Sequence, residues 1–248
     1  MSFSDDEVER YARHLVLREI GGPGQQKLKA ARVLMIGAGG LGAPASLYLA
    51  AAGVGRLGLV DPDHVSLSNL QRQVIFATAD LGAPKVVAAA AHLGALNPHV
   101  VVDPHPVAIT AQNARSLVAG YDLVLDGTDD FATRFVVNDA CLAEGKPLVS
   151  GAIGRWTGQV GVFCRPGGPC YRCLTPEIPP DAETCQRVGV MGALAGVIGS
   201  MMALEAIKVI TGLEPSLTGR LLIYDALAAE ARTVKLHKDP ACPACAGR

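Results

Sequence analysis

The sequence has no excess of charge of either sign. It contains 22 Lys and Arg residues against 23 Asp and Glu residues, which gives a net charge of −1 over 248 residues. A chain so close to neutral has no overall attraction to nucleic acid or to an anionic membrane surface, although a local anion site remains compatible with it. Half of the residues are apolar, so the chain is able to bury a substantial core.

The sequence also lacks the features of an export signal or a membrane span. The N-terminus, MSFSDDEVER, is acidic, whereas a signal peptide begins with basic and then apolar residues. The uncharged run over residues 190–204 is shorter than the roughly 20 apolar residues that cross a bilayer, and Glu205 follows it at once. We therefore expect a cytoplasmic protein without a membrane partner, and a helix over 190–204 that is buried or lies at a dimer interface. Close helix packing is favoured by Gly192, Gly196 and Gly199.

Histidine pairs at metal-ligand spacing are absent as well. The six histidines are His14, His64, His92, His99, His105 and His237. None of them stands beside a plausible nucleophile. The seven cysteines, in a chain that begins with this acidic segment, favour metal ligands and core thiols over a disulfide framework.

Short apolar segments alternate with helical patterns through the first two thirds of the chain. Strands are predicted at 32–37 and 56–61 and within 100–109, 121–130 and 147–153. Helices are predicted over 43–53, 85–96 and 131–145, with an N-terminal helix over 5–19 that GGPG (21–24) breaks, and a short helix before Arg32. This alternation is typical of a doubly wound, mostly parallel Rossmann-like sheet. Strand-like segments at 158–164, 219–226 and 230–236 predict an antiparallel C-terminal extension.

The first predicted strand leads into the glycine turn GAGGLG. Gly37, Gly39 and Gly42 follow the G-x-G-x-x-G order and precede a helix. Glycines allow the backbone to approach a phosphate, and a helix N-terminus offers free N–H groups. Asp61 ends the next strand, 19 residues after Gly42, where a carboxylate is able to accept hydrogen bonds from a ribose. The pattern predicts an adenosine-containing ligand, does not separate NAD from ATP, and leaves a purely structural tight turn open.

Polar residues in two further segments favour a triphosphate. Asn69, Arg72 and Gln73 lie within one helical turn, and Lys85 follows them. Across the predicted crevice, the fourth strand ends in LDGTDD, which supplies Asp126, Asp129 and Asp130. Two cations facing carboxylates suit the phosphates of ATP and a Mg²⁺ ion, whereas hydride transfer needs no such group. The alternative is that Arg72 and Lys85 are solvated surface charges.

Two CxxC pairs predict a metal site. Cys170 and Cys173 form one pair, and Cys242 and Cys245 form the other. Together they offer four thiolates to one tetrahedral Zn²⁺, and a four-sulfur site is structural. Redox pairs or two separate zinc knuckles are the alternatives, but no thioredoxin-like unit surrounds either pair.

These motifs resemble those of the ThiF/MoeB adenylyltransferases, bacterial relatives of the ubiquitin-activating enzymes. The resemblance rests on GAGGLG, DPDHVSLSNLQRQ, GAPKV, LDGTDD and the paired CxxC motifs, and it extends from RYARHLVLREIG to the last cysteines. It implies an enzyme that binds Mg-ATP and a ubiquitin-like sulfur carrier protein ending in Gly-Gly. Such an enzyme joins AMP to the C-terminal carboxylate of the carrier and releases pyrophosphate, in molybdopterin or thiamine thiazole biosynthesis.

The resemblance also implies roles for individual residues. The positions that match the family's ATP site are Gly40, Asp61, Ser68, Asn69, Leu70, Gln71, Arg72, Lys85, Asp129 and Asp130. We expect Arg72, Lys85 and Arg13 to contact the phosphates and Asp129 to hold Mg²⁺. Arg13 matches an arginine that reaches the site of the partner subunit, which implies a homodimer. Asp130 departs from the asparagine expected at its position, and its role stays open.

The remaining cysteines and the single tryptophan carry weaker expectations. Cys185 lies in a polar stretch near Arg187, a setting that favours a reactive thiolate, and it resembles a position where some family members form a thioester or persulfide link with the carrier. An idle loop cysteine is the alternative. Cys141 and Cys164 are expected to be core thiols. Trp156 is expected to pack or to contact the tail of the carrier.

We expect one domain over 1–248. Its parts are an N-terminal helical arm (1–31), a nucleotide-binding half (32–155) and a half that binds the carrier and zinc (156–248). No sulfurtransferase segment precedes Arg248, so a separate protein is expected to donate sulfur. Two other functions stay open at this point, an NAD-dependent oxidoreductase and a non-catalytic nucleotide-binding scaffold for carrier proteins.

Overall fold

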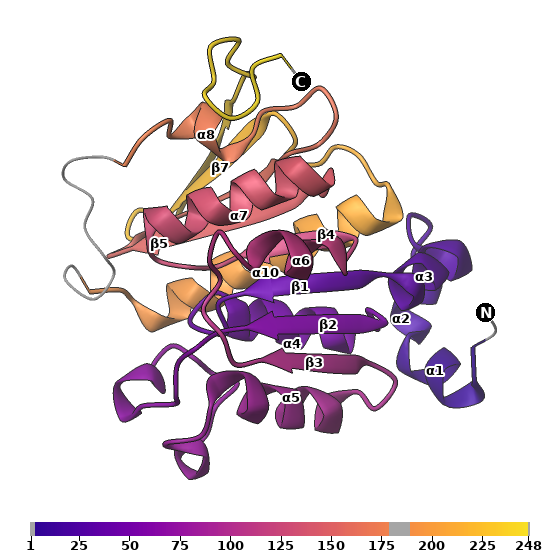
Figure 1. The fold of residues 1–248 in the computed structure, drawn as a ribbon. Coiled ribbons are helices and arrows are strands. Elements are labelled where there is room, and N and C mark those ends of the chain that lie inside the picture. Colours follow the sequence, from indigo (N-terminus) through magenta and orange to yellow (C-terminus); the bar gives the residue numbers. More distant parts are fainter. Residues whose placement is uncertain (1–2, 179–188, 248) are drawn as a thin grey trace.

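The computed structural model, which describes residues 3–178 and 189–247, contains an eight-stranded sheet (Figure 1). The strand order is β3-β2-β1-β4-β5-β6-β7-β8. Strands β1 to β5 are parallel, and β6, β7 and β8 continue the sheet antiparallel. The strands are β1 (Arg32–Ile36), β2 (Arg56–Val60), β3 (Val101–His105), β4 (Leu123–Asp126), β5 (Leu148–Gly154), β6 (Thr157–Phe163), β7 (Arg220–Asp225) and β8 (Glu230–Lys235). The doubly wound sheet with an antiparallel C-terminal extension is confirmed.

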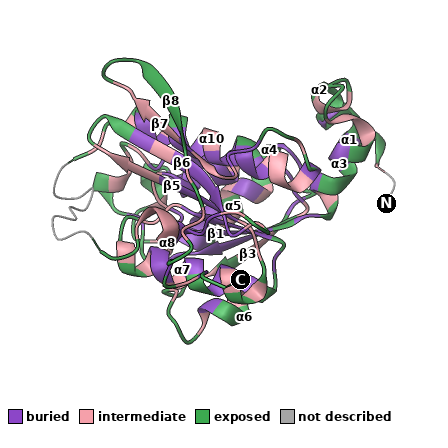
Figure 2. Ribbon diagram, turned by 90° about the horizontal axis from the view of Figure 1, so that it is seen from above, coloured by how far each residue is buried: buried purple, intermediate pink, exposed green. Residues whose placement is uncertain are grey.

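Alternating side chains of the parallel strands enter two different cores. Val33 and Met35 of β1 point into a core that contains α4 (Gly42–Ala51), α5 (Lys85–Leu96) and α10 (Gly192–Thr211). Leu34 and Ile36 point to the other face, where α6 (Ala114–Ala119), α7 (Phe131–Glu144) and α8 (Tyr171–Leu174) lie. Both faces of the parallel strands are therefore covered, which explains why these strands read as continuous apolar runs. Figure 2 shows the buried residues concentrated along the sheet and the inner sides of the helices.

The N-terminal helices differ from the prediction. The expected helix over 5–19 is divided into α1 (Asp5–Arg10) and α2 (Ala12–Leu15), because Tyr11 turns into the protein and is 3% exposed. The GGPG segment does not lie between helices but forms the first turn of α3 (Gly21–Ala30). Proline is tolerated in a first turn, where its missing N–H has no helical partner to lose.

Helix α10 is apolar and long enough, by length and composition, to cross a membrane. It packs against α4, β5 and β6, and the buried carboxylate of Glu205 accepts a hydrogen bond from the Leu217 amide at 2.7 Å. These contacts place one side of α10 in the core, and 44% of its apolar window is buried. It begins two residues after the predicted start and continues to Thr211.

Candidate functional site

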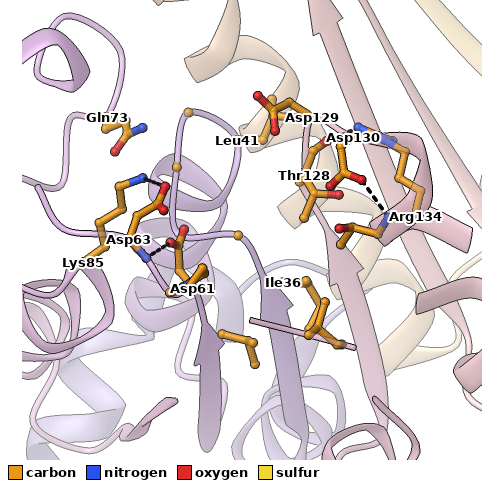
Figure 3. A pocket seen from close by; sticks show the side chains of 18 of the residues that line it. Ile36, Leu41, Asp61, Asp63, Gln73, Lys85, Thr128, Asp129, Asp130 and Arg134 are labelled. Atoms are coloured by element: carbon orange, nitrogen blue, oxygen red, sulfur yellow. Dashed lines mark hydrogen bonds and ion pairs between the residues drawn. The ribbon is translucent and has the colours of Figure 1, made fainter. Parts of the chain in front are cut away.

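A cavity of about 800 Å³ lies at the carboxyl ends of the parallel strands. The glycine turn after β1, the loop after β2 and the loop after β4 all line it. Strands β1 and β4 are neighbours, and the chain continues from them in opposite directions across the sheet. This topological switch point is where open α/β sheets bind their ligands. Figure 3 shows Lys85 and Asp63 on one side of the cavity, and Asp129 and Asp130 on the other.

The glycine turn requires glycine at two of its predicted positions. Gly37 has φ +87°, which L side chains rarely adopt. A Cβ on Gly42, the first residue of α4, would lie 1.9 Å from the carbonyl oxygen of Gly37. Gly37, Gly39 and Gly40 line the cavity, whereas Gly42 is not among the lining residues. Gly42 therefore allows the tight turn, and its neighbours offer the backbone approach that a phosphate needs.

Asp61 fastens the glycine turn to the loop after β2. Its carboxylate is buried and accepts hydrogen bonds from the Ala38 amide at 2.8 Å and the Asp63 amide at 2.9 Å. Asp61 also lines the cavity. Each carboxylate oxygen has a second lone pair, so Asp61 is able to hold the loop and still accept a hydrogen bond from a ribose hydroxyl.

The loop after β2 brings two cations to the cavity. A 3₁₀ turn over Leu67–Asn69 precedes Arg72, whose guanidinium donates to the carbonyl oxygen of Ser68 at 2.9 Å. Lys85, the first residue of α5, has a side chain only 7% exposed, and its ammonium pairs with Asp63 at 2.8 Å. Both cations line the cavity, with Ser68 and Asn69. The proximity of Arg72 and Lys85 that the sequence predicts is thus present in the structure.

Gln73 has a buried polar atom without a partner. Its side chain is 3% exposed and lines the cavity, and its Oε1 atom makes no hydrogen bond to any residue that the structure describes. The amide nitrogen lies 3.3 Å from the position of a Cβ on Gly39. An unsatisfied buried polar atom costs about 1–3 kcal/mol, so its presence beside the glycine turn fits a pocket that a polar ligand fills.

The three acidic residues after β4 have three different environments. Asp126 is 1% exposed and accepts hydrogen bonds from the Thr128 amide and hydroxyl at 3.0 and 2.7 Å. Asp130 is the N-cap of α7 and accepts a hydrogen bond from the Thr133 amide at 2.9 Å. Asp129 is exposed to the cavity and makes no hydrogen bond or ion pair with the residues at 3–178 and 189–247.

These environments separate the roles that the sequence left together. Asp126 fixes the loop, and Asp130 caps a helix, a position that asparagine and aspartate fill equally well. The departure from asparagine at Asp130 therefore leaves the helix cap intact. Of the three residues, Asp129 has the carboxylate that fits a Mg²⁺ ion, because it lines the cavity and has no partner in the described part of the chain.

Arg134 is a site residue that the sequence reasoning missed. Its side chain is 5% exposed and lines the cavity. It donates hydrogen bonds to the carbonyl oxygen of Gly151 at 2.8 Å, to the Ser150 hydroxyl at 3.1 Å and to the carbonyl oxygen of Thr128. A charged residue within the apolar pattern of a predicted helix was the available signal, since an arginine in such a position is buried only with partners.

Several predicted residues lie elsewhere. Leu70 and Gln71 are not among the residues that line the cavity. Gln71 instead packs against Gly192, and a Cβ added to Gly192 would lie 2.2 Å from the carbonyl oxygen of Gln71. Arg13 is exposed on α2 and also does not line the cavity of its own chain. Cys185 lies outside the described residues.

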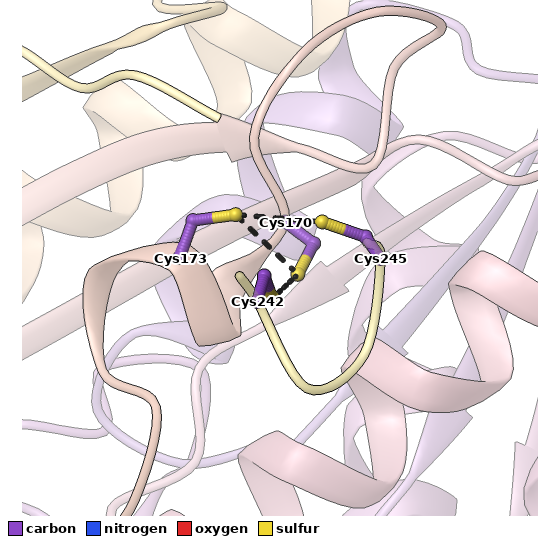
Figure 4. Close-up of side chains that lie close together, drawn as sticks. All are labelled: Cys170, Cys173, Cys242 and Cys245. Carbon is purple, nitrogen blue, oxygen red and sulfur yellow. Dashed lines mark hydrogen bonds between the residues drawn. The ribbon is translucent and has the colours of Figure 1, made fainter. Parts of the chain in front are cut away.

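The four cysteines of the CxxC motifs form one cluster (Figure 4). The sulfur atoms of Cys170 and Cys173 are 3.9 Å apart, those of Cys170 and Cys242 are 3.6 Å apart, and those of Cys173 and Cys245 are 3.5 Å apart. All four sulfurs lie within 4.8 Å of one another. Tetrahedral Zn–S bonds of about 2.3 Å place the sulfurs about 3.8 Å apart, so the cluster fits one shared structural zinc ion and not two separate knuckles.

The two other described cysteines are core thiols, as predicted. Cys141 and Cys164 are buried. Burial raises the pKa of both thiols well above the usual value, because a thiolate is disfavoured away from water. Neither is therefore a reactive thiolate near neutral pH. Trp156 is 41% exposed and is not one of the residues lining the cavity.

The chain is similar to known proteins over nearly its whole length. The ThiF family matches residues 11–244. The sulfur carrier protein adenylyltransferase of Thermus thermophilus is 48% identical over 252 residues, covering 99% of this chain and 93% of that protein. The probable adenylyltransferase/sulfurtransferase MoeZ of Mycobacterium tuberculosis is 50% identical over 248 residues. That match covers 98% of this chain but only 63% of MoeZ.

Solved structures show the same fold. The crystal structure of E. coli MccB with MccA-N7isoASN has a TM-score of 0.85 at 20% identity, covering 99% of this chain and 76% of that one. The structure of E. coli MccB with ATP has a TM-score of 0.83 at 22% identity and covers 95% of this chain and 74% of that one. The chain, matched by the family over nearly its whole length and by relatives at about half identity, belongs to the ThiF family.

Proposed function

We propose that this protein is an ATP-dependent adenylyltransferase that activates the C-terminal carboxylate of a ubiquitin-like sulfur carrier protein. The carboxylate attacks the α-phosphate of ATP, AMP becomes attached to the carrier, and pyrophosphate leaves. The observation that carries the proposal is the convergence of the glycine turn, Arg72, Lys85 and the unpartnered Asp129 on one cavity at the switch point of the sheet. The names of the relatives support the same reaction, and no observation favours hydride transfer or a scaffold without catalysis.

The residue types in the cavity suit this chemistry. A carboxylate is already ionised at neutral pH, so the reaction needs no general base. It does need relief of the repulsion between the carboxylate and the phosphates, which Arg72 and Lys85 are placed to provide. A Mg²⁺ ion held by Asp129 would add further charge compensation. Positioning of the two reactants supplies the rest of the acceleration.

The cavity extends toward a second group of strands, which gives a path for the tail of the carrier. Ala152 and Ile153 of β5 and Gln159 of β6 line it beyond the glycine turn. We propose that this part accepts a tail ending in Gly-Gly. Residues 32–155 would bind the nucleotide and contribute Ala152 and Ile153 to the tail path, while 156–248 would bind the rest of the carrier and zinc. The carrier would serve molybdopterin or thiamine thiazole biosynthesis in the cytoplasm.

An exposed apolar face supports a homodimer. Tyr48 of α4 is 59% exposed, and Leu204 of α10 is 61% exposed, although the two helices pack together. A contiguous patch of such side chains would be typical of a surface that another chain covers. Figure 1 shows the N-terminal helices near the amino ends of the parallel strands, away from the loops after β1, β2 and β4. We propose that a second copy covers the face of α4 and α10, and that Arg13 completes the partner's site.

Complementation between two inactive variants tests this arrangement. Arg13→Ala and Asp129→Asn are each expected to be inactive as homodimers. Refolded together in equal amounts, they form mixed dimers in which one site of two is intact, so about a quarter of the wild-type activity returns. If Arg13 served its own chain, every site would carry one lesion, and no activity would return. Gel filtration of each variant checks that the dimers form.

Exchange of labelled pyrophosphate into ATP tests the reaction itself. Exchange should require a carrier that ends in Gly-Gly, and the same carrier without its last two residues is the matched control. Exchange in the absence of any carrier, or its absence with every Gly-Gly carrier tried, would contradict the proposed function.

A further inference from the structure

The loop between the first two zinc-site cysteines also forms part of the nucleotide cavity. Tyr171 stands directly after Cys170, in the short helix α8 that ends beside Cys173. It is 3% exposed and lines the cavity. Its ring packs edge-on against Phe163, with the ring centroids 5.5 Å apart. One side chain therefore belongs to the zinc loop and to the cavity wall.

Tyr171 contacts the buried cation that organises the loop after β4. The guanidinium carbon of Arg134 lies 5.7 Å from the centroid of the Tyr171 ring, within the range of a cation–π contact. The same guanidinium donates to the carbonyl oxygens of Thr128 and Gly151. Because Thr128 directly precedes Asp129, Arg134 connects the zinc loop to the backbone that presents Asp129 to the cavity.

Helix α7 carries Arg134 and also anchors the zinc loop that contains Tyr171. Arg134 and Asn138 are one helical turn apart and face the same side of the helix. Asn138 is fully buried, and its amide oxygen accepts a hydrogen bond from the Tyr171 amide at 2.7 Å. Arg172 pairs with Asp139 of α7 at 2.9 Å. The zinc loop is thus fixed along α7 by two neighbouring contacts, and it presents the Tyr171 ring to Arg134.

We propose that the loop of Cys170 to Cys173 is a positioning element of the nucleotide cavity, in which Tyr171 seats Arg134 and Arg134 fixes the loop that carries Asp129. The role of Asp129 as a metal ligand rests on the proposed function. The contacts from Tyr171 through Arg134 to the loop of Asp129 do not depend on it. The four thiolates, by closing around zinc, would hold α8 in place and keep the Tyr171 ring against the guanidinium. Tyr171 is a positioning residue, because it acts on Asp129 through Arg134.

Hydrogen–deuterium exchange of the purified zinc-loaded protein tests the connection without ATP. In the wild type the Thr128 amide donates to Asp126 at 3.0 Å, so it is expected to be protected. Tyr171→Leu keeps an apolar side chain but loses the aromatic face, and exchange over residues 127–130 should become about tenfold faster. Tyr171→Phe retains the ring but loses the hydroxyl, which also hydrogen-bonds with the Arg134 side chain, so it should restore part of the protection. Peptides that cover the glycine turn, at 37–42, serve as the internal control and should not change.

Zinc content decides how the exchange is interpreted. Tyr171→Leu retains all four cysteines and should still bind one zinc ion per chain. Faster exchange at 127–130 in a zinc-loaded, cooperatively folded variant supports the connection, and unchanged exchange there overturns it. If Tyr171→Leu no longer unfolds cooperatively, Tyr171→Met, with a flexible side chain that fills the same space, takes its place under the same criteria.

Enzyme kinetics provide a separate measurement. In pyrophosphate exchange, the Mg²⁺ concentration for half-maximal rate should rise about tenfold in Tyr171→Leu, because the carboxylate of Asp129 would no longer be held in one position. It should rise less in Tyr171→Phe, which keeps the ring and loses only the hydroxyl. A purely structural role of Tyr171 would lower the amount of folded enzyme and leave this concentration unchanged. A wild-type protein without exchange activity would refute the proposed function alone, and the hydrogen-exchange result would still decide the connection.

Discussion

The nucleotide cavity and the cysteine cluster use polar side chains in opposite ways. In the cluster, four sulfurs from two distant segments face one another within 4.8 Å, so a metal ion bound there would have no position left for a substrate. In the cavity, the Asp129 carboxylate and the Gln73 amide oxygen have no partner among the residues described. A closed ligand set stabilises a fold, and an open one is able to bind and react. The substitutions below test this contrast.

Asp129→Asn should have the largest effect, because it removes the open carboxylate and changes almost nothing else. We expect the rate of pyrophosphate exchange to fall about 10³-fold, which corresponds to about 4 kcal/mol of lost transition-state stabilisation. The matched control is Asp130→Asn, one residue along the chain, where asparagine caps α7 as well as aspartate does. A loss of similar size in both variants would contradict the distinction between an open and a capping carboxylate.

Cys242→Ser should break the closed site. It removes one thiolate of four, and we expect the zinc content to fall below one ion per chain and the free energy of unfolding to fall by about 3 kcal/mol. Metal analysis and thermal unfolding measure the two effects. Cys141→Ala removes a buried cysteine outside the cluster, and this variant should retain its zinc. Full zinc occupancy in Cys242→Ser would show that the cluster is not one site.

Tyr11→Phe tests a third kind of polar group, in the N-terminal arm. The Tyr11 hydroxyl has a hydrogen-bond partner within the protein and belongs to neither the cysteine cluster nor the cavity. The Tyr11 hydroxyl accepts a hydrogen bond from the buried Asn97 amide at 2.9 Å. Its removal leaves one N–H without a partner and should cost about 1 kcal/mol in the free energy of unfolding. Tyr48→Phe removes a hydroxyl that makes no hydrogen bond with the described residues of its own chain, and this variant should cost almost nothing. Equal losses would indicate that the arm is not held by Asn97.

Glu7→Gln should give the smallest effect, and one that depends on pH. Burial raises the pKa of Glu7, but the hydrogen bonds from Lys29 and from the Ser4 amide outweigh it, so the pKa lies below its usual value. A carboxylate with a lowered pKa stabilises the folded state above its unfolded pKa of about 4.3 and loses that contribution as the pH falls through its folded pKa.

The difference in Tm between wild type and Glu7→Gln should therefore be present at pH 7 and shrink as the pH falls through the acidic range. Glu9→Gln, at an exposed position of the same helix, should show no such dependence. A difference that is constant with pH would mean that the ion pair with Lys29 does not contribute.

Local patterns predicted most of the fold. The apolar runs of β1 and β2, the helix over Lys85–Leu96 and the two CxxC pairs appear where the sequence places them, because period, propensity and ligand spacing are local properties. The division of the helix over 5–19 was not predictable, since it depends on a tertiary contact of Tyr11 with Asn97.

The candidate site was predictable in its residues more than in their roles. Residue type and position alone do not distinguish Asp126, Asp129 and Asp130, and it was the family resemblance that assigned Mg²⁺ to Asp129. Their partners in the structure distinguish a loop anchor, an open carboxylate and a helix cap. Arg134 was missed because its importance comes from the carbonyl oxygens of Thr128 and Gly151, which the fold brings to it. Roles that depend on long-range hydrogen bonds require the structure.

Transfer of label from ATP to the carrier tests the central claim most directly. A carrier ending in Gly-Gly, incubated with the wild-type protein and ATP labelled at the α-phosphate, should become labelled at its C-terminal carboxylate, while ATP labelled at the γ-phosphate should give labelled pyrophosphate only. Label from the γ-phosphate on the carrier, or no label from the α-phosphate, would contradict cleavage at the α-phosphate and with it adenylation by this site.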